Sequence, residues 1–295
     1  MKLATILINY NDEENTIKLA KTLESYEEIS RILIVDNCSP NQESFEKIKE
    51  IENEKIYVVE ADKNGGYNYG INFGVHFLEN KNEQFDILMC SNTDIEISEG
   101  AIKECIEKLN ENENTGMVAP RMLDKQKKPI RRSSWRLRTF WRDIVHSTRL
   151  LELIFYSKLR SGEYLEEDYK EDTLEVEAIS GACFFIKYEI LKKINYLDEN
   201  VFLFYEEDIL GYKLKELGYK TYSLNNINFI HFESQSIGKT INYYKKMKQL
   251  FKSKMYYQKN YNKINKFQSF CFYILWIFRN IELCFEIPIR KMLKK

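Results

Sequence analysis

The sequence predicts an α/β protein with a mostly parallel sheet, and three observations support this fold class. Short apolar runs alternate with helical patterns through the first 120 residues, as they do in βαβ units. The runs are nearly continuous in apolar residues, which is typical of strands buried on both faces. Each run ends in small polar residues, where open α/β sheets bind their ligands. A chain of 295 residues suffices for one such domain with an appendage.

The elements of the first part follow in a regular order. Strands are expected at residues 3–8, 32–35, 56–59 and 85–90. After each strand, apolar residues recur at three- or four-residue spacing, which predicts an amphipathic helix. The four helical stripes start at Ile17, Phe45, Ile71 and Ile102.

The later part of the chain is less regular. Residues 176–187 and 229–232 predict two further strands. A leucine stripe over residues 210–217 predicts a helix that ends at Gly218, because glycine commonly terminates helices. From residue 239 onward the pattern is helical.

Small polar residues gather at the ends of the early strands. These residues are Asn9, Asn11, Asp36, Asn64, Gly65, Gly66, Asn92 and Asp94. Singly, each also suits a turn or a helix cap. Because the carboxyl ends of parallel strands share one edge of a sheet, together they predict a ligand site.

Two familiar nucleotide motifs are excluded. A dinucleotide fingerprint places its glycines after the first strand, whereas here they follow the third. No phosphate-binding G-x-x-x-x-G-K-[ST] sequence is present. Gly70 and Gly74 are instead expected to allow close packing of a helix on the sheet.

Two further features carry candidate chemistry. Asp94, which follows a strand, suits a divalent cation that a diphosphate also binds, and His231 would be a second ligand of that cation. The alternative for Asp94 is a turn residue, and the alternative for His231 is a structural histidine. Glu206, Glu207 and Asp208 begin a helix. They suit either a general base or simple complementarity to the helix dipole.

Several ordered motifs together resemble the inverting family 2 glycosyltransferases, particularly the bacterial rhamnosyltransferase-like branch. The resemblance covers roughly residues 3–235. The motifs are ILINYN at 6–11, VDNCS at 35–39, NGGYNYGINFG at 64–74, SNTD at 91–94, GACFFI at 181–186, LDE at 197–199 and YEED at 205–208.

The resemblance implies a type-A glycosyltransferase fold and a set of site residues. Glu207 aligns with the catalytic base, flanked by Glu206 and Asp208, and Asp94 with His231 implies a Mg²⁺ or Mn²⁺ site. Asn92 and Ile209 stand where the family usually has acids. The donor-binding residues implied are Asn9, Tyr10, Asn11, Asp36, Asn64, Gly65, Asn72 and Asn92.

Charge divides the chain into an acidic body and a basic end. The net charge is −1, but residues 239–295 hold 14 basic and two acidic residues. A second basic, aromatic stretch covers residues 131–160. We therefore expect a catalytic domain at 1–235 with an acceptor-side insertion at 131–170, and a helical, basic, aromatic extension at 236–295. The extension suits a membrane interface; packing on the catalytic domain or on a second subunit is the alternative.

Composition places further bounds on the class of protein. Six scattered cysteines without a C-x-x-C pair argue against a zinc ribbon and a disulfide scaffold. We expect no signal peptide, no transmembrane helix and no nucleic-acid partner, because no recognised module is present. The expected location is the cytoplasm, at the inner face of the cytoplasmic membrane.

The sequence thus predicts an inverting transferase that moves a hexosyl or rhamnosyl group from a nucleotide-diphosphate sugar to a glycan or lipid-linked glycan in polysaccharide biosynthesis. A nucleotidyltransferase is disfavoured because no Gly-rich phosphate loop follows the first strand. A degenerate, non-catalytic glycan- or nucleotide-sugar-binding protein of the same fold stays an alternative. A homo-oligomer also stays open.

Overall fold

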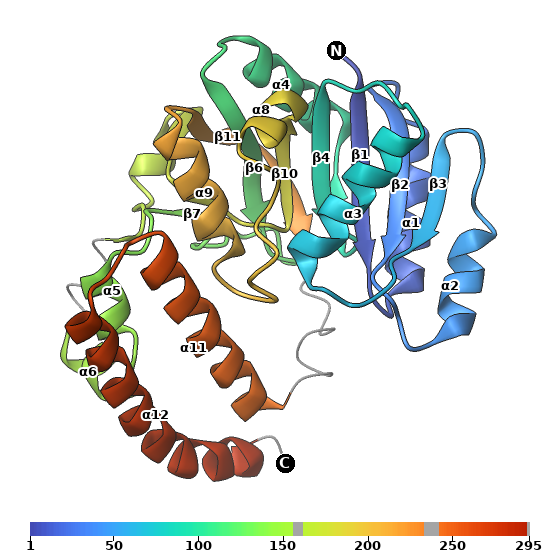
Figure 1. The fold of residues 1–295 in the computed structure, drawn as a ribbon. Helices are drawn as coiled ribbons and strands as arrows, with labels where there is room; N and C mark the ends of the chain where they lie inside the picture. Colours follow the sequence, from blue (N-terminus) through green and yellow to red (C-terminus); the bar gives the residue numbers. More distant parts are fainter. Residues whose placement is uncertain (156–161, 233–241, 294–295) are drawn as a thin grey trace.

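The computed structural model describes residues 1–155, 162–232 and 242–293. A central sheet is covered by helices on both faces, and helices from two distant parts of the chain form an arm beside it (Figure 1). The predicted α/β class and helical C-terminal region are confirmed.

The first half of the sheet is parallel, with the order β3-β2-β1-β4. Asn9 lies opposite Asp36 in the register of β1 and β2, and Ile8 lies opposite Asn92 in that of β1 and β4. The polar strand ends therefore meet at one edge, as predicted. The strands are β1 (Leu3–Asn9), β2 (Ile29–Asp36), β3 (Ile56–Glu60) and β4 (Ile87–Asn92).

The second half of the sheet is mixed. β10 (Cys183–Lys187) lies between β4 and β6 (Thr115–Leu123) and is antiparallel to both. β11 (Lys220–His231) is parallel to β6. Two short strands, β5 (Ile95–Ile97) and β8 (Thr173–Val176), pair with β11 in the antiparallel sense.

The single strand expected at residues 176–187 is wrong. The segment is divided among the end of β8, a short β9 (Ala178–Ile179) and β10, and β9 pairs with β7 (Ser134–Trp135) outside the main sheet. Gly181 and Ala182 form a turn between β9 and β10. Hydrophobic periodicity did not reveal this turn because most of its neighbours are apolar.

Helices pack on both faces of the sheet. α1, α2 and α4 bury apolar side chains in one core, and α3, α8 and α9 do so in the other. Gly74 on α3 confirms the predicted close packing, since a Cβ there would lie 2.9 Å from Val35 Cγ2. The bounds are α1 (Glu13–Glu24), α2 (Gln42–Lys49), α3 (Tyr67–Asn80), α4 (Glu99–Asn110), α8 (Tyr188–Lys193) and α9 (Glu206–Glu216).

The arm combines the insertion with the C-terminal helices. Phe140 and Phe272 meet edge to face with ring centroids 5.4 Å apart. The backbone N–H groups of Arg149 and Leu150 donate to Glu282 at 2.8 and 3.0 Å. The arm helices are α5 (Phe140–Val145), α6 (Arg149–Ile154), α11 (Tyr243–Asn260) and α12 (Lys266–Leu293), and the insertion also contains the short helix η2 (Asp168–Lys170).

The arm also packs on the catalytic body. Tyr257 of α11 is fully buried in a cluster with Val201, Tyr205 and Ile209, so α11 packs on the body that carries the central sheet. The predicted boundary at residues 235 and 236 lies outside the described residues. All six cysteines are free, and across the described ranges no helix has the length and hydropathy to cross a membrane.

Candidate active site

Side chains join the carboxyl ends of β1 and β2. Asn9 is fully buried, and its Nδ2 donates to Asp36 Oδ2 at 2.5 Å. Asp36 also accepts from the N–H and Oγ of Ser39 at 2.7 and 2.8 Å. Ser39 Oγ in turn accepts from the Asn11 N–H at 2.9 Å, and Tyr10 lies between Asn9 and Asn11 in the chain. The structure therefore brings these four predicted donor residues together.

The loop after β3 closes against the segment that precedes α9. Gly66 has φ +90°, and a Cβ there would lie 2.3 Å from the Phe202 carbonyl oxygen. Asn64 Oδ1 accepts from the Gly66 N–H at 3.2 Å and from Asn37 Nδ2 at 3.3 Å. Gly65 lies within the same loop, so both predicted donor residues are placed beside the β2 end.

Asn72 is buried beneath the strand ends rather than displayed at them. Its Nδ2 donates to the Leu197 carbonyl and to Glu199 Oε1, each at 2.8 Å, and its Oδ1 accepts from the Leu197 N–H at 3.1 Å. These bonds attach residues 197–199 to α3. The structure gives Asn72 a supporting position, and a direct contact with the donor stays a prediction.

Asp94 and His231 are brought side by side by the pairing of β5 with β11. His231 lies opposite Ile95 in that register. Its Nε2 is 3.3 Å from Asp94 Oδ1 and 3.5 Å from Asn92 Nδ2. Among the residues described, no three His, Cys, Asp or Glu side chains are grouped to hold a metal by themselves. A carboxylate with an imidazole fits a divalent cation whose remaining ligands are water and phosphate oxygens.

The acidic tract at the start of α9 separates its three carboxyl groups. Glu207 Oε1 accepts from the Gly181 N–H at 3.3 Å. Asp208 Oδ1 accepts from the Arg138 N–H at 3.2 Å, and its Oδ2 lies 3.6 Å from Arg138 Nε. Glu206 Oε2 is buried without a hydrogen-bond partner in the described part of the chain. Only Glu207 therefore faces the turn between β9 and β10.

Burial shifts the ionisation of all three acids. It raises the pKa of Glu207 to about 7, against hydrogen bonds from the Glu207 and Gly181 backbone N–H groups that stabilise the anion. It raises the pKa of Asp208 to about 6, although the positive Arg138 opposes the shift. Burial and then the charge of Glu207 raise the pKa of Glu206 well above its ordinary value. A carboxylate with a pKa near neutrality is matched to general-base work.

The turn of residues 181 and 182 links the donor edge to the acidic tract. The Ala182 carbonyl accepts from the Asn92 N–H at 2.9 Å. Tyr67 Oη donates to the Gly181 carbonyl at 2.6 Å, while the Gly181 N–H donates to Glu207. One backbone turn thus positions the end of β4 and the carboxylate of Glu207 relative to each other.

Sequence reasoning missed several residues of this site. Asp12 accepts from Thr93 Oγ1 at 2.9 Å, and burial raises the pKa of Asp12. Its place after the first strand was a usable signal. Arg138 and Asp143 gave no comparable signal in the sequence, because they lie in an insertion without a periodic pattern.

Residues 5–194 match the family model described as glycosyl transferase family 2. The chain belongs to this family, which confirms the family-level resemblance; the rhamnosyltransferase-like branch stays a prediction. The low-salt glycan biosynthesis hexosyltransferase Agl10 of Haloferax volcanii is 25% identical over 214 residues. The alignment covers 72% of this chain but 61% of that relative, so the chain spans less than two thirds of its length.

Solved structures confirm the type-A glycosyltransferase fold. GalNAc-T7 with UDP, GalNAc and Mn²⁺ has a TM-score of 0.61 at 12% identity, covering 78% of this chain and 43% of that chain. S. aureus TarS 1–349 with UDP-GlcNAc has a TM-score of 0.58 at 14% identity, covering 96% and 73%. The mannosyltransferase PcManGT of Pyrobaculum calidifontis with GDP-Man and Mn²⁺ has a TM-score of 0.55 at 12% identity. The match covers 90% of this chain and 65% of that chain.

Proposed function

We propose that the protein is an inverting glycosyltransferase that uses a nucleotide-diphosphate sugar, with Glu207 as the general base. The observation that carries this proposal is the turn at Gly181, which presents Glu207 to the edge where the strand ends meet. The pKa of about 7 for Glu207 supports the same role. Asp208 is paired with Arg138. Glu206 does not share the bond that joins Glu207 to the Gly181 turn. Neither is therefore the preferred base.

The reaction follows from this placement. Glu207 accepts the proton of an acceptor hydroxyl, whose oxygen attacks the anomeric carbon of the donor. The bond from that carbon to the nucleoside diphosphate breaks on the opposite face, so the configuration inverts. Asp36 and the residues around Asn9 and Asn64 bind the nucleoside side of the donor.

A divalent cation, Mg²⁺ or Mn²⁺, fits the pair formed by Asp94 and His231. When bound, it would neutralise charge on the departing diphosphate. The residues of this chain contribute one carboxylate and one imidazole, and Asn92 lies within 3.5 Å of the imidazole.

The experiment that tests the function is donor turnover. Purified protein is incubated with UDP-, dTDP- and GDP-linked hexoses and rhamnose, with Mn²⁺ or with EDTA, and released nucleoside diphosphate is measured. We expect metal-dependent release from one donor class. Release that EDTA does not reduce would contradict the metal site.

The matched variant is Glu207→Gln, which keeps the size and removes the charge. We expect it to lose on the order of a hundredfold or more in turnover, as general bases typically contribute 10²–10⁴-fold, while donor binding by calorimetry is retained. Near wild-type turnover would contradict the base assignment. Binding of a donor without turnover in the wild type, with acceptor glycans supplied, would favour a degenerate binding protein.

We place the acceptor on the arm side of the molecule and propose a lipid-linked glycan at the inner face of the cytoplasmic membrane. α12 carries a stripe of exposed apolar side chains, which with three from α6 forms a surface named here the arm face. Its members are Leu150, Leu153, Ile154, Phe267, Phe270, Ile274, Ile277, Phe278, Ile281, Phe285 and Ile289.

An anionic bilayer is the proposed occupant of the arm face. Phe267 and Phe285 are 72% and 69% exposed, and an aromatic helix with basic residues suits a membrane interface. Arg149 and Arg290 are among the residues that line a cavity of about 960 Å³ between α6, α11 and α12. The 14 basic residues against two acids over 239–295 add attraction to anionic headgroups.

A further inference from the structure

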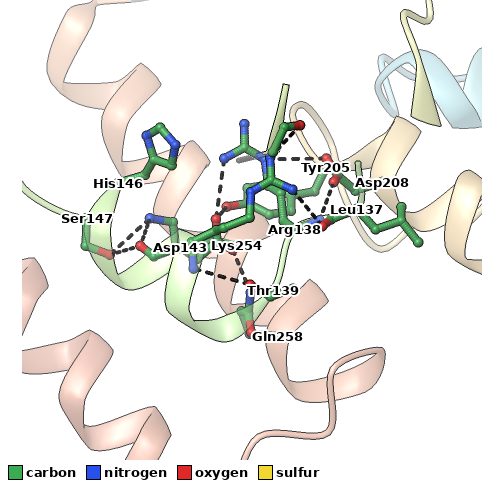
Figure 2. A network of polar contacts seen from close by, with 12 residues as sticks. Leu137, Arg138, Thr139, Asp143, His146, Ser147, Tyr205, Asp208, Lys254 and Gln258 are labelled. Carbon is green, nitrogen blue, oxygen red and sulfur yellow. Dashed lines mark hydrogen bonds and ion pairs between the residues drawn. The ribbon is translucent and has the colours of Figure 1, made fainter. Parts of the chain in front are cut away.

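A buried polar network joins α9 to the arm (Figure 2). Its centre is Asp143 of α5, which is fully buried. Asp143 Oδ1 accepts from Tyr205 Oη at 2.8 Å and Oδ2 accepts from Gln258 Nε2 at 2.6 Å. Arg138 connects this carboxylate to Asp208, at 3.4 Å from Asp143 Oδ1 and 3.6 Å from Asp208 Oδ2. The insertion, α11 and the acidic tract therefore share one set of contacts.

The network holds a strained turn directly before Glu207. Phe204 and Tyr205 have φ of +70° and +69°, a conformation that is unfavourable for non-glycine residues and persists only when the surroundings impose it. Asp143 holds the Tyr205 hydroxyl, and Ser253 Oγ of α11 donates to the Leu203 carbonyl at 2.7 Å. Both sides of the turn are thus attached to the arm.

Glu207 follows this turn by two residues, on the first turn of α9. A change in the backbone at Tyr205 would rotate the start of α9 and move Glu207 away from the Gly181 N–H. Tyr205 also packs against Tyr257, with ring centroids 5.4 Å apart, and the bond from its hydroxyl to Asp143 links the ring to α5.

We propose that Asp143 is a positioning residue that holds the left-handed Phe204–Tyr205 turn, so that the arm directs the base Glu207 toward its substrate. The proposal rests on the function proposed above. It makes the C-terminal helices part of the catalytic apparatus, independently of any membrane contact.

The test compares Tyr205→Phe with Tyr256→Phe. Tyr205→Phe removes the hydroxyl group that donates to Asp143 and keeps the aromatic ring. Tyr256→Phe is the matched control: Tyr256 of α11 packs on the same cluster, but its Oη donates to Asp198 Oδ2 at 2.8 Å, so its loss leaves the bond between Tyr205 and Asp143 in place. We expect Tyr205→Phe to lower kcat on the order of ten- to a hundredfold, because small displacements of a catalytic group cost this much, with donor KM unchanged and the control near wild type.

Two measurements distinguish a role of Asp143 in positioning Glu207 from a role in folding alone. Loss of the Gly181 hydrogen bond should move the acid limb of the pH–rate profile upward in Tyr205→Phe, since that bond stabilises the Glu207 anion. In a double-mutant cycle with Asp143→Asn, the two losses should be strongly non-additive. Additive losses, or a Tyr205→Phe enzyme that behaves as the control does, would overturn the proposal.

Hydrogen exchange over residues 203–210 provides a measurement without turnover. We expect faster exchange in Tyr205→Phe than in Tyr256→Phe; equal exchange would contradict the proposal. Glu207→Gln is assayed in parallel. If Glu207→Gln stays active, the base assignment fails, whereas an inactive Glu207→Gln with an unaffected Tyr205→Phe rejects the positioning role alone.

Discussion

Three neighbouring acids at the start of α9 occupy three different environments. Glu207 meets a backbone N–H, Asp208 meets the cation of Arg138, and Glu206 has an unpaired buried oxygen among the described residues. The sequence left the base open among these three. The contacts favour Glu207, because it alone is joined to the turn that also holds the end of β4.

The raised pKa of Glu207 predicts the pH dependence of transfer. As the proposed base, Glu207 must be ionised to accept a proton, so activity should fall as the pH drops through about 7, the pKa to which burial raises this residue. The measurement is log kcat/KM against pH, with an expected slope near one on the acid side. An acid limb near the ordinary glutamate pKa of about 4.3 would contradict this environment for Glu207.

The raised pKa of Glu207 also predicts that Glu207→Gln stabilises the native state at alkaline pH. In the native state Glu207 stays protonated up to about pH 7, whereas the unfolded chain releases this proton at lower pH. The native state therefore binds more protons in that interval, and the free energy of unfolding falls as pH rises. We expect the melting temperature of Glu207→Gln to exceed that of the wild type more at pH 8 than at pH 5. A pH-independent difference would argue against the raised pKa.

At the scale of elements, strand pairing and helix packing build the site. β5 and β11 place His231 beside Asp94, and the turn between β9 and β10 supports Glu207. At Gly211, α9 closely approaches the residue before β9: a Cβ there would come within 2.1 Å of the Glu177 carbonyl oxygen. The direction of α9, and with it that of the acidic tract, depends on this close approach.

Gly211→Ala should therefore separate α9 from β9. We expect a loss of about 1–3 kcal/mol in the free energy of unfolding, the usual range for overpacking, together with reduced turnover. Gly100→Ala is the matched control: Gly100 is also helical, but a Cβ there meets no atom within 4 Å. The control should be neutral or more stable by up to about 1 kcal/mol. Chemical denaturation of both variants tests the difference; equal effects would reject the packing argument.

At the scale of the whole molecule, the fold joins two basic, aromatic stretches that are far apart in the sequence. Phe140 contacts Phe272, and α6 is capped by Glu282 of α12. The arm thus has one side on the catalytic body, through Tyr257, and an apolar side facing out. The two helices of the insertion, α5 and α6, and the C-terminal helices α11 and α12 therefore form one structural unit (Figure 1).

The arm face predicts binding to anionic vesicles. Phe278→Glu with Phe285→Glu should reduce the bound fraction on phosphatidylglycerol vesicles at least about tenfold, because each buried Phe contributes about 1.5–3 kcal/mol. Leu217→Glu is the control, since Leu217 is 53% exposed on the body. Sedimentation measures binding. If the double variant instead converts a dimer to a monomer in light scattering and vesicle binding is unchanged, a second copy covers this face and the membrane proposal is wrong.

The gathering of polar residues at one edge of the sheet was predictable, and the reason is geometric. Runs of buried strands can be identified from the sequence, and their polar ends necessarily share an edge when the strands are parallel. Asn9, Asp36 and Asn64 were placed at this edge in this way, and their contact with a donor stays a prediction. Asn72 was also singled out, but its amide is used to hold residues 197–199, and no local pattern distinguishes that support from a ligand contact.

The sequence by itself determined the α/β class, the glycosyltransferase family and the identity of the acidic tract, because these depend on local periodicity and on ordered motifs. Tertiary structure decided which acid faces the site, that β10 runs antiparallel, and that the arm reaches the turn before Glu207. Those features depend on contacts between residues far apart in the chain, such as Asp143 with Tyr205 and Gln258. Such contacts follow from packing in three dimensions and leave no periodic signal along the sequence.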